Sequence, residues 1–208
     1  MSADVNNTEL SFEDLMGELE NCVEQLEKGG ISLEGAAEIY EKGMTLAVEA
    51  GRRLSQAELK ITSIQEKYEQ ALEAANKALN KTPNHRGAMM CKALVFISEK
   101  KYIKADITLS NLIIFLERNL EDDDKTGIGT LAAAYANRGI IKDRNKNYEE
   151  ALKDYVKALG IDHEAVAGPG LGTIILNYKF KSSSVKERAL YLNEQLQLPE
   201  DERVLSIK

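Results

Sequence analysis

The chain has 208 residues and a formal net charge of −7, with 43% hydrophobic but only 6% aromatic residues. Tryptophan is absent and proline occurs three times, so few positions interrupt a helix and the expected class is all-α. The acidic balance argues against a protein that grips a nucleic-acid backbone directly.

Residues 11–28 form the first predicted helix. The Ser11 hydroxyl can accept a hydrogen bond from the amide of Asp14, where a capping-box acid belongs, and Gly29-Gly30 ends the helix. The apolar residues recur at three- and four-residue steps along one stripe: Phe12, Leu15, Met16, Leu19, Cys22, Val23 and Leu26. The pattern predicts a helix that packs on one face.

Ser32 opens a second predicted helix, whose apolar and small residues alternate at four- and three-residue steps. They are Leu33, Ala37, Tyr40, Met44, Ala47, Gly51 and Leu54. This heptad-like seam predicts a coiled-coil-like helical hairpin that needs a partner, because two short stripes bury little by themselves. We predict a partner-binding seam made of Phe12, Leu15, Leu19, Val23, Leu26, Leu33, Tyr40, Met44 and Leu54.

A family resemblance runs through the whole hairpin in one register. It is carried by Phe12-Glu13, Leu19-Glu20, Val23, Leu26-Glu27, Gly29, Leu33-Glu34, Tyr40-Glu41-Lys42-Gly43, Leu46, Leu54 and Ala57-Glu58. In these residues the chain resembles the small subunit of exodeoxyribonuclease VII. The resemblance implies a non-catalytic hairpin that packs on the long helices of a larger nuclease subunit, in an enzyme that degrades single-stranded DNA.

Charge is distributed unevenly between the two parts of the chain. Residues 1–65 hold 13 acidic and 5 basic side chains, whereas residues 66–208 hold 21 acidic and 22 basic ones. Because an acidic hairpin repels phosphate, a role in DNA metabolism would run through a protein partner. We therefore expect a large nuclease subunit or another protein as partner, and no direct nucleic-acid binding.

The second part, residues 66–208, resembles tetratricopeptide repeat proteins. Tyr68, Ala71, Ala75, Ala78 and Pro83 mark the second helix of a first copy, and Tyr102 recurs 34 residues after Tyr68. A third copy is the clearest, with Tyr135, Asn137-Arg138-Gly139, Tyr148, Ala151, Tyr155 and Ala158. The resemblance implies a right-handed α-solenoid of about three to four helix pairs.

Two features of the repeats depart from the regular pattern. The second hairpin helix occupies the place of the first repeat's first helix, so it either continues into Tyr68–Leu79 or breaks near residues 65–67. Tyr148 follows Tyr102 by 46 residues instead of 34, which predicts an insert at Glu117 to Gly129.

The C-terminal part is predicted to close the array. Gly168-Pro169-Gly170 is a helix stop, and Leu171–Phe180 reads as a helix. Ser184-Val-Lys-Glu187 is a capping box for a last helix, and Pro199 follows its end. These residues are a degenerate fourth repeat or a capping pair.

First-helix positions of the repeats predict a binding groove for a peptide or helix. Its residues are Met90, Leu94, Ile97, Ala133, Ala136, Ile140 and Asp143, with Asn137 and Arg138 nearby. The Lys, Asn and Arg set that clamps a terminal carboxylate in some members of the repeat family is missing here. An alternative is that Met90 and Leu94 pack against the additional N-terminal helix.

No residue pattern predicts a catalytic site, a metal site or a cofactor. His85 and His163 lie in loops without ligand spacing, and residues 122–124 lack the pattern of a calcium loop. The glycines of residues 168–172 fit neither phosphate-binding motif. Cys22 and Cys91 lack C-x-x-C spacing and are expected to be reduced core residues.

Two functions remain open at this stage. One is an accessory subunit of a single-stranded-DNA exodeoxyribonuclease with a repeat extension that binds proteins. The other is a repeat scaffold whose hairpin serves as an end cap or self-association element. Residues 1–7 have no basic region or apolar run, and the densest apolar segment, residues 112–116, is too short to cross a bilayer. We expect a cytoplasmic protein in either case.

Overall fold

The computed structural model describes residues 10–162, 166 and 184–205. Within these residues the chain is helical and contains no strand, as the sequence predicts. It divides into two compact units, Met1–Lys67 and Tyr68–Lys208. The boundary between them lies two residues after residue 65, where the sequence analysis divides the chain. The predicted helix stop at Gly168-Pro169-Gly170, the predicted helix Leu171–Phe180 and His163 fall outside the described residues.

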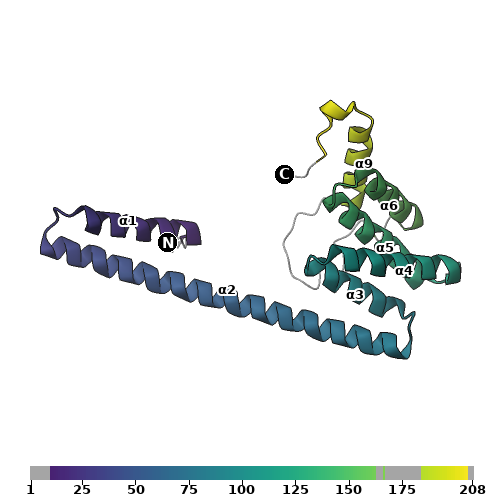
Figure 1. Cartoon of the computed structure of the whole chain (residues 1–208), viewed down its shortest axis with the longest axis horizontal. Coiled ribbons are helices and arrows are strands. Elements are labelled where there is room, and N and C mark those ends of the chain that lie inside the picture. The colour runs from purple at the N-terminus through teal and green to yellow at the C-terminus, as the bar shows by residue number, and fades with distance from the viewer. Residues whose placement is uncertain (1–9, 163–165, 167–183, 206–208) are drawn as a thin grey trace, which may run out of the picture. The chain divides into compact units, whose positions relative to one another are not determined.

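Unit 1 is a helical hairpin, with α1 (Phe12–Lys28) lying alongside the first part of α2 (Leu33–Lys81) in Figure 1. The Ser11 capping box is present, since the Asp14 amide donates to the Ser11 hydroxyl at 3.0 Å. Gly29 and Gly30 both have positive φ, which lets the chain turn without a Cβ clash. The Gly35 amide then donates to Ser32 Oγ at 3.1 Å and opens α2.

Helix α2 runs for 49 residues to Lys81 without a break. This resolves the alternative left open by the sequence, because nothing between Arg52 and Lys81 is glycine or proline and the helix has no reason to end. Pro83 follows two residues after its end. Residues Tyr68–Lys81 of this helix belong to unit 2.

Unit 2 continues with two helix pairs that turn in the same way. The first pair is α3 (Arg86–Ser98) and α4 (Tyr102–Asn119), and the second is α5 (Lys125–Arg144) and α6 (Tyr148–Ile161). Both turns use a lysine with positive φ, 58° at Lys100 and 64° at Lys146. In each turn the next amide donates back to a carbonyl five residues earlier at 2.8 Å.

The extra residues between the second and third repeats lengthen helices instead of forming a loop. Helix α5 has 20 residues where α3 has 13, and α4 has 18 where α6 has 14. Only residues 120–124 connect α4 to α5. The expected insert at Glu117 to Gly129 is therefore mostly helical.

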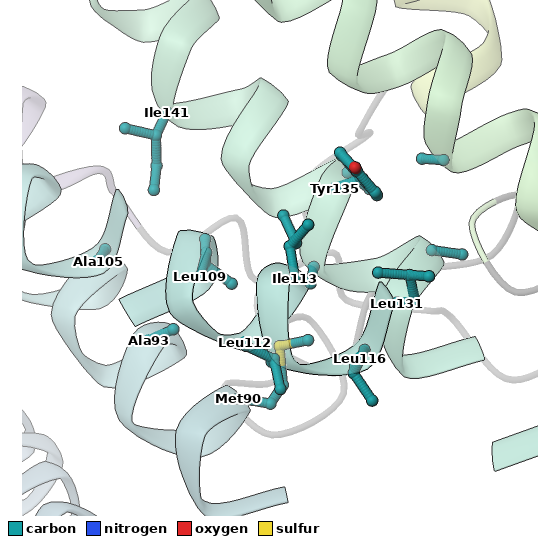
Figure 2. Close-up of a cluster of buried hydrophobic side chains, with 14 of the residues drawn as sticks. Met90, Ala93, Ala105, Leu109, Leu112, Ile113, Leu116, Leu131, Tyr135 and Ile141 are labelled. Atoms are coloured by element: carbon teal, nitrogen blue, oxygen red, sulfur yellow. The ribbon is translucent and has the colours of Figure 1, made fainter. Parts of the chain in front are cut away.

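The core of unit 2 lies among α3, α4 and α5 (Figure 2). Leu72 of α2 packs against it. Its fully buried large side chains include Leu109, Leu112 and Leu116 of α4. A second cluster joins α6 to the last helix α9 (Val185–Leu196) through Ala151, Tyr155, Ala189 and Leu192. Ser184 and Glu187 form the predicted capping box of α9, and the 3₁₀ turn η1 (Glu200–Glu202) follows Pro199.

Gly139 permits the close approach of α5 and α6. A Cβ at this position would lie 2.7 Å from the Tyr155 ring and 3.3 Å from the Ala151 carbonyl oxygen. The repeat pattern placed a small residue here for this reason.

Candidate protein-docking face

The contact between the two hairpin helices uses only some of the predicted seam residues. Leu15 is 2% exposed and Cys22 is buried, while Leu19 is partly buried. A Cβ on Gly43 would be 3.5 Å from Cys22 Cβ and 3.9 Å from Leu19 Cδ1, so Gly43 of α2 faces these residues of α1. Leu15 and Leu19 therefore belong to the interior of the hairpin.

On α2, each residue of the row that packs against α1 lies one position before a residue of the predicted seam. The partly or fully buried positions here are Ala36, Ile39, Gly43, Leu46 and Ala50, again at three- and four-residue steps. The predicted seam residues Leu33, Tyr40, Met44 and Leu54 are 88%, 60%, 49% and 54% exposed. Helix α2 thus carries two adjacent apolar rows, of which one is used within the hairpin.

The exposed rows of the two helices lie on the same side of the hairpin. Each residue of an α-helix is turned by 100° about the helix axis from the residue before it. The exposed row of α2 follows its buried row by one residue, and Val23 likewise follows Cys22, so both are turned in the same direction about their helix axes. Phe12 is turned in that direction from Leu15 as well. In an antiparallel pair of right-handed helices, equal rotations turn both rows to one side. We call this surface the hairpin face; its residues are Phe12, Val23, Leu26, Leu33, Tyr40, Met44 and Leu54.

Polar contacts close the hairpin away from this face. Lys42 Nζ lies 3.0 Å from Glu18 Oε2, and both residues are rotated to the opposite side of their helices. Arg53 Nη1 donates to the Leu10 carbonyl at 2.6 Å, and its Nε donates to Glu49. Hydrogen bonds from Arg52 and Arg53 lower the pKa of Glu49 from 4.5 to about 2. These contacts hold the hairpin together and leave the hairpin face uncovered.

The predicted groove residues of unit 2 lie mostly in packed positions. Met90, Ala136 and Asp143 are buried. Leu94, Ile97 and Ala133 pack against the core, and Ile140 packs against the second cluster. Asn137 is partly exposed and its Nδ2 donates to the Ala133 carbonyl at 2.8 Å. Met90 and Leu94 share the core with Leu72 of α2, in line with the packing alternative, and the groove stays a prediction for the partly exposed residues.

Two ion pairs with buried carboxylates, which the sequence did not reveal, cross unit 2. Arg188 of α9 donates through Nε and Nη2 to the two carboxylate oxygens of Asp143 at 2.7 Å each, and Tyr155 donates to the same carboxylate at 3.1 Å. Burial and the charge of Asp143 raise the pKa of Tyr155. Nothing in a single sequence links Asp143 to a residue 45 positions away.

The second pair joins α5 to α6. Arg138 donates to both oxygens of Asp154 at 2.7 and 2.8 Å, and its hydrogen bond to Asp154 raises the pKa of Arg138. Lys142 Nζ lies 2.9 Å from the same carboxylate. Arg138 and Lys142 share the Asp154 carboxylate, and Arg188 pairs with Asp143, so these charged groups are engaged in packing the helices against one another.

The remaining candidates for chemistry are held in structural contacts. His85 caps α3, because its Nδ1 accepts from the Ala88 amide at 3.1 Å. Asp124 caps α5 and pairs with Arg86, which lowers the pKa of Asp124. Among the described residues, no three His, Cys, Asp or Glu side chains are grouped to hold a metal ion. No helix in that part of the chain is long and apolar enough to span a membrane.

Comparison with known proteins finds a family match in each of the two parts of the chain. The family model of the exonuclease VII small subunit matches residues 12–63, and the tetratricopeptide repeat model matches residues 132–164. No solved structure matches the chain.

Among the similar curated proteins are three exodeoxyribonuclease 7 small subunits. The one from Bartonella quintana is 45% identical over 58 residues, which cover 28% of this chain and 69% of that protein. The one from Staphylococcus epidermidis is 39% identical over 54 residues, covering 26% and 71%. The one from Ruegeria sp. is 38% identical over 64 residues, covering 31% and 79%. Through its hairpin, the chain belongs to the exonuclease VII small-subunit family.

Proposed function

We propose that this chain is a non-catalytic accessory subunit of a single-stranded-DNA exodeoxyribonuclease of the exonuclease VII type. The observation that carries the proposal is the exposed hairpin face, which lies within the residues that the family shares. An apolar row on an exposed helix is costly in water and is typical of a surface that another helix covers. The large nuclease subunit is the proposed partner, and a cytoplasmic location goes with this role.

The acidic charge of the hairpin supports docking on protein instead of DNA. Acidic side chains flank the hairpin face, among them Glu13, Glu20 and Glu24 of α1 and Glu34 and Glu41 of α2, all exposed. They repel phosphate and favour a protein surface that carries lysine or arginine beside apolar residues. In this proposal the large subunit binds and cleaves the DNA, and the repeat unit extends the assembly as a protein-binding module.

Co-expression with the exonuclease VII large subunit of the same organism tests the proposal. We expect the two chains to co-purify and the complex to degrade single-stranded DNA. Tyr40→Asp together with Met44→Asp should abolish co-purification, because both side chains lie on the hairpin face and neither supports the hairpin interior. Leu19→Asp is a poorer probe, since Leu19 packs between the helices.

Val156→Asp is the matched control, because Val156 of α6 is 57% exposed and lies outside the hairpin. It should leave co-purification unchanged. The proposal is wrong if the wild-type chains do not associate, or if the doubly substituted chain associates as well as the wild type while circular dichroism shows it to be folded.

A second candidate function is a repeat scaffold, favoured by unit 2, which packs its own core and makes up about two thirds of the chain. In that case the hairpin would be an end cap or a self-association element. Partners captured equally well by wild type and by the Tyr40→Asp, Met44→Asp variant would support the scaffold. Loss of every partner in that variant would contradict it.

A further inference from the structure

The outer side of helix α4 carries an apolar row. Ile103, Ile107 and Ile114 are 78%, 56% and 45% exposed, whereas Leu109 and Leu112 on the opposite side of the helix are fully buried. At 100° per residue, the three isoleucines fall within an arc of about 40°. Isoleucine is a weaker helix former than leucine or lysine, so helix stability does not account for three exposed copies.

The charged residues of α4 are sorted around this row. Lys104 and Arg118 are exposed, and both are turned to the same side of the row, by about 40–80° from its middle. Asp106 and Glu117 are turned by about 60–80° to the other side. There the Tyr135 hydroxyl of α5 donates to Glu117. The outward surface of α4 is therefore apolar and cationic; we call it the α4 face, and its residues are Ile103, Lys104, Ile107, Ile114 and Arg118.

The hairpin face has the complementary composition. Its apolar rows are bordered by exposed glutamates, each on the side of its helix that is turned away from the other helix. These are Glu20 and Glu27 of α1 and Glu34 and Glu41 of α2. Residues 1–65 as a whole carry a net charge of −8. The hairpin face thus offers an apolar seam between two acidic borders.

We propose that the α4 face of one copy of this chain docks on the hairpin face of a second copy. Helix α4 lies along the seam between α1 and α2 of the second copy, where its isoleucines meet the apolar rows and its cations meet the glutamates. Charge selects this pairing, because two α4 faces would oppose cations to cations and two hairpin faces would oppose glutamates to glutamates. The contact joins two different surfaces, so it can continue from copy to copy.

The two surfaces also agree in length. At 1.5 Å per residue, the hairpin face runs for about 31 Å from Leu33 to Leu54, and Lys104 and Arg118 are separated by about 21 Å along α4. The whole α4 face therefore fits on the hairpin face, with both cations above the acidic borders.

This contact goes beyond the proposed function and uses a surface that the proposed function also needs. The large nuclease subunit and a second copy of the chain compete for the hairpin face. The free chain is therefore expected to associate with itself, and binding of the large subunit is expected to dissociate it.

The contact is that of one helix on a hairpin, so we expect a dissociation constant roughly in the micromolar range. Analytical ultracentrifugation of the full-length chain at low salt should show the average mass rising from 23.1 kDa past that of a dimer as the concentration passes through this range. High salt should weaken the association. Lys104→Glu with Arg118→Glu should weaken it by about tenfold or more. Val156→Asp, on α6, is the control and should have no effect.

Two variants that each lack one surface test whether the contact joins unlike faces. Lys104→Glu with Ile107→Asp removes the α4 face, and Tyr40→Asp with Met44→Asp removes the hairpin face. Each variant alone should be monomeric. An equimolar mixture should form a one-to-one dimer, because each molecule keeps the surface that the other has lost. Circular dichroism checks that both variants are folded.

A wild-type chain that stays monomeric through the micromolar range overturns the proposal. So does a mixture of the two folded variants that remains monomeric, because association of the wild type would then run between like surfaces. A monomeric wild type that binds a fluorescent oligodeoxythymidine, with binding lost in Lys104→Glu, Arg118→Glu, would assign the α4 face to nucleic acid instead.

Co-purification with the large subunit separates this contact from the proposed function. The α4 variants keep the hairpin face, so they should lose self-association and still co-purify with the large subunit. A wild-type chain that associates with itself but does not co-purify contradicts only the proposed function. One that co-purifies but never associates with itself contradicts only the α4 contact.

Discussion

The two units of this chain use apolar residues in opposite ways. In the hairpin, Leu15, Cys22 and Ala50 are buried, whereas seven larger apolar side chains on the hairpin face remain exposed. In the repeat unit, α3 to α6 and α9 enclose two buried clusters, and two bidentate Arg–Asp pairs cross the packed helices. The repeat unit therefore buries most of its large apolar side chains within itself, whereas the hairpin leaves a row of them exposed. We propose that a partner covers that row.

The largest effect is expected from breaking the buried pair that holds α9. Asp143→Ala would leave Arg188 buried without its carboxylate, which typically costs about 3–5 kcal/mol. Urea unfolding followed by circular dichroism measures the change in the free energy of unfolding. Glu150→Ala, which removes an exposed partner of Lys153, is the control and should stay within about 0.5 kcal/mol. If Asp143→Ala lowered the free energy of unfolding no more than Glu150→Ala does, the Asp143–Arg188 pair would not be buried away from solvent.

A smaller loss is expected where α5 and α6 meet. Gly139→Ala would push a methyl group against the Tyr155 ring and should cost about 1–3 kcal/mol. Gly160→Ala is the matched control in α6, because its Cβ would meet no atom within 4 Å. That change should raise the free energy of unfolding by up to about 1 kcal/mol. Equal effects of the two substitutions in thermal or urea unfolding would show that the helices do not approach as closely as described.

A modest gain is expected in the turn between α5 and α6. Lys146 has a φ of 64°, a backbone conformation that glycine adopts without strain. Lys146→Gly should stabilise the repeat unit by about 0.5–1 kcal/mol, because relief of strain outweighs the added freedom of the unfolded chain. Lys153→Gly, inside α6, should instead cost about 1 kcal/mol. A loss of stability in Lys146→Gly would contradict the left-handed turn.

The smallest effect concerns the exposed ion pairs of the hairpin. The pKa of Glu49 is about 2 in the folded hairpin, below its ordinary value of 4.5. A lowered pKa stabilises the fold above pH 4.5, and this contribution is lost as the pH falls from 4.5 toward 2. The protection factors of the hairpin amides, which are corrected for the intrinsic pH dependence of exchange, should therefore fall over this range in the wild type.

Glu49→Gln is the control for that pH dependence. It removes the titrating group, so its hairpin should be less protected at neutral pH and should change less between pH 4.5 and 2. Parallel profiles of the two proteins would show that Glu49 does not carry the effect.

Local signals in the sequence predicted the helices well. Ser11, Ser32 and Ser184 each cap the helix that they were expected to open, and Gly29-Gly30 ends α1. The periodicity of Tyr135, Gly139 and Tyr155 predicted a repeat whose helices approach closely, and the family match at residues 132–164 confirms the repeat. These features depend on residues close in sequence, which a single chain displays directly.

The sequence did not predict which side of each helix contacts its neighbour. Helix α2 has two apolar rows one residue apart, and Tyr40 and Ile39 fit their respective rows equally well. Which row meets α1 depends on how closely the helices approach, and Gly43 permits that approach beside Cys22. Asp143 was expected to line a groove because it occupies a first-helix position of the repeat. In the structure it pairs with Arg188 of α9, a helix that lies far from it in the sequence.

Hydrogen–deuterium exchange of the full-length chain, with and without the exonuclease VII large subunit, tests the central claim most directly. We expect amides of α1 and of residues 33–54 to gain protection in the complex, while the core helices α4 and α5 exchange slowly in both states. Protection that appears only in the repeat unit, or no change anywhere on binding, would contradict the hairpin face as the docking surface.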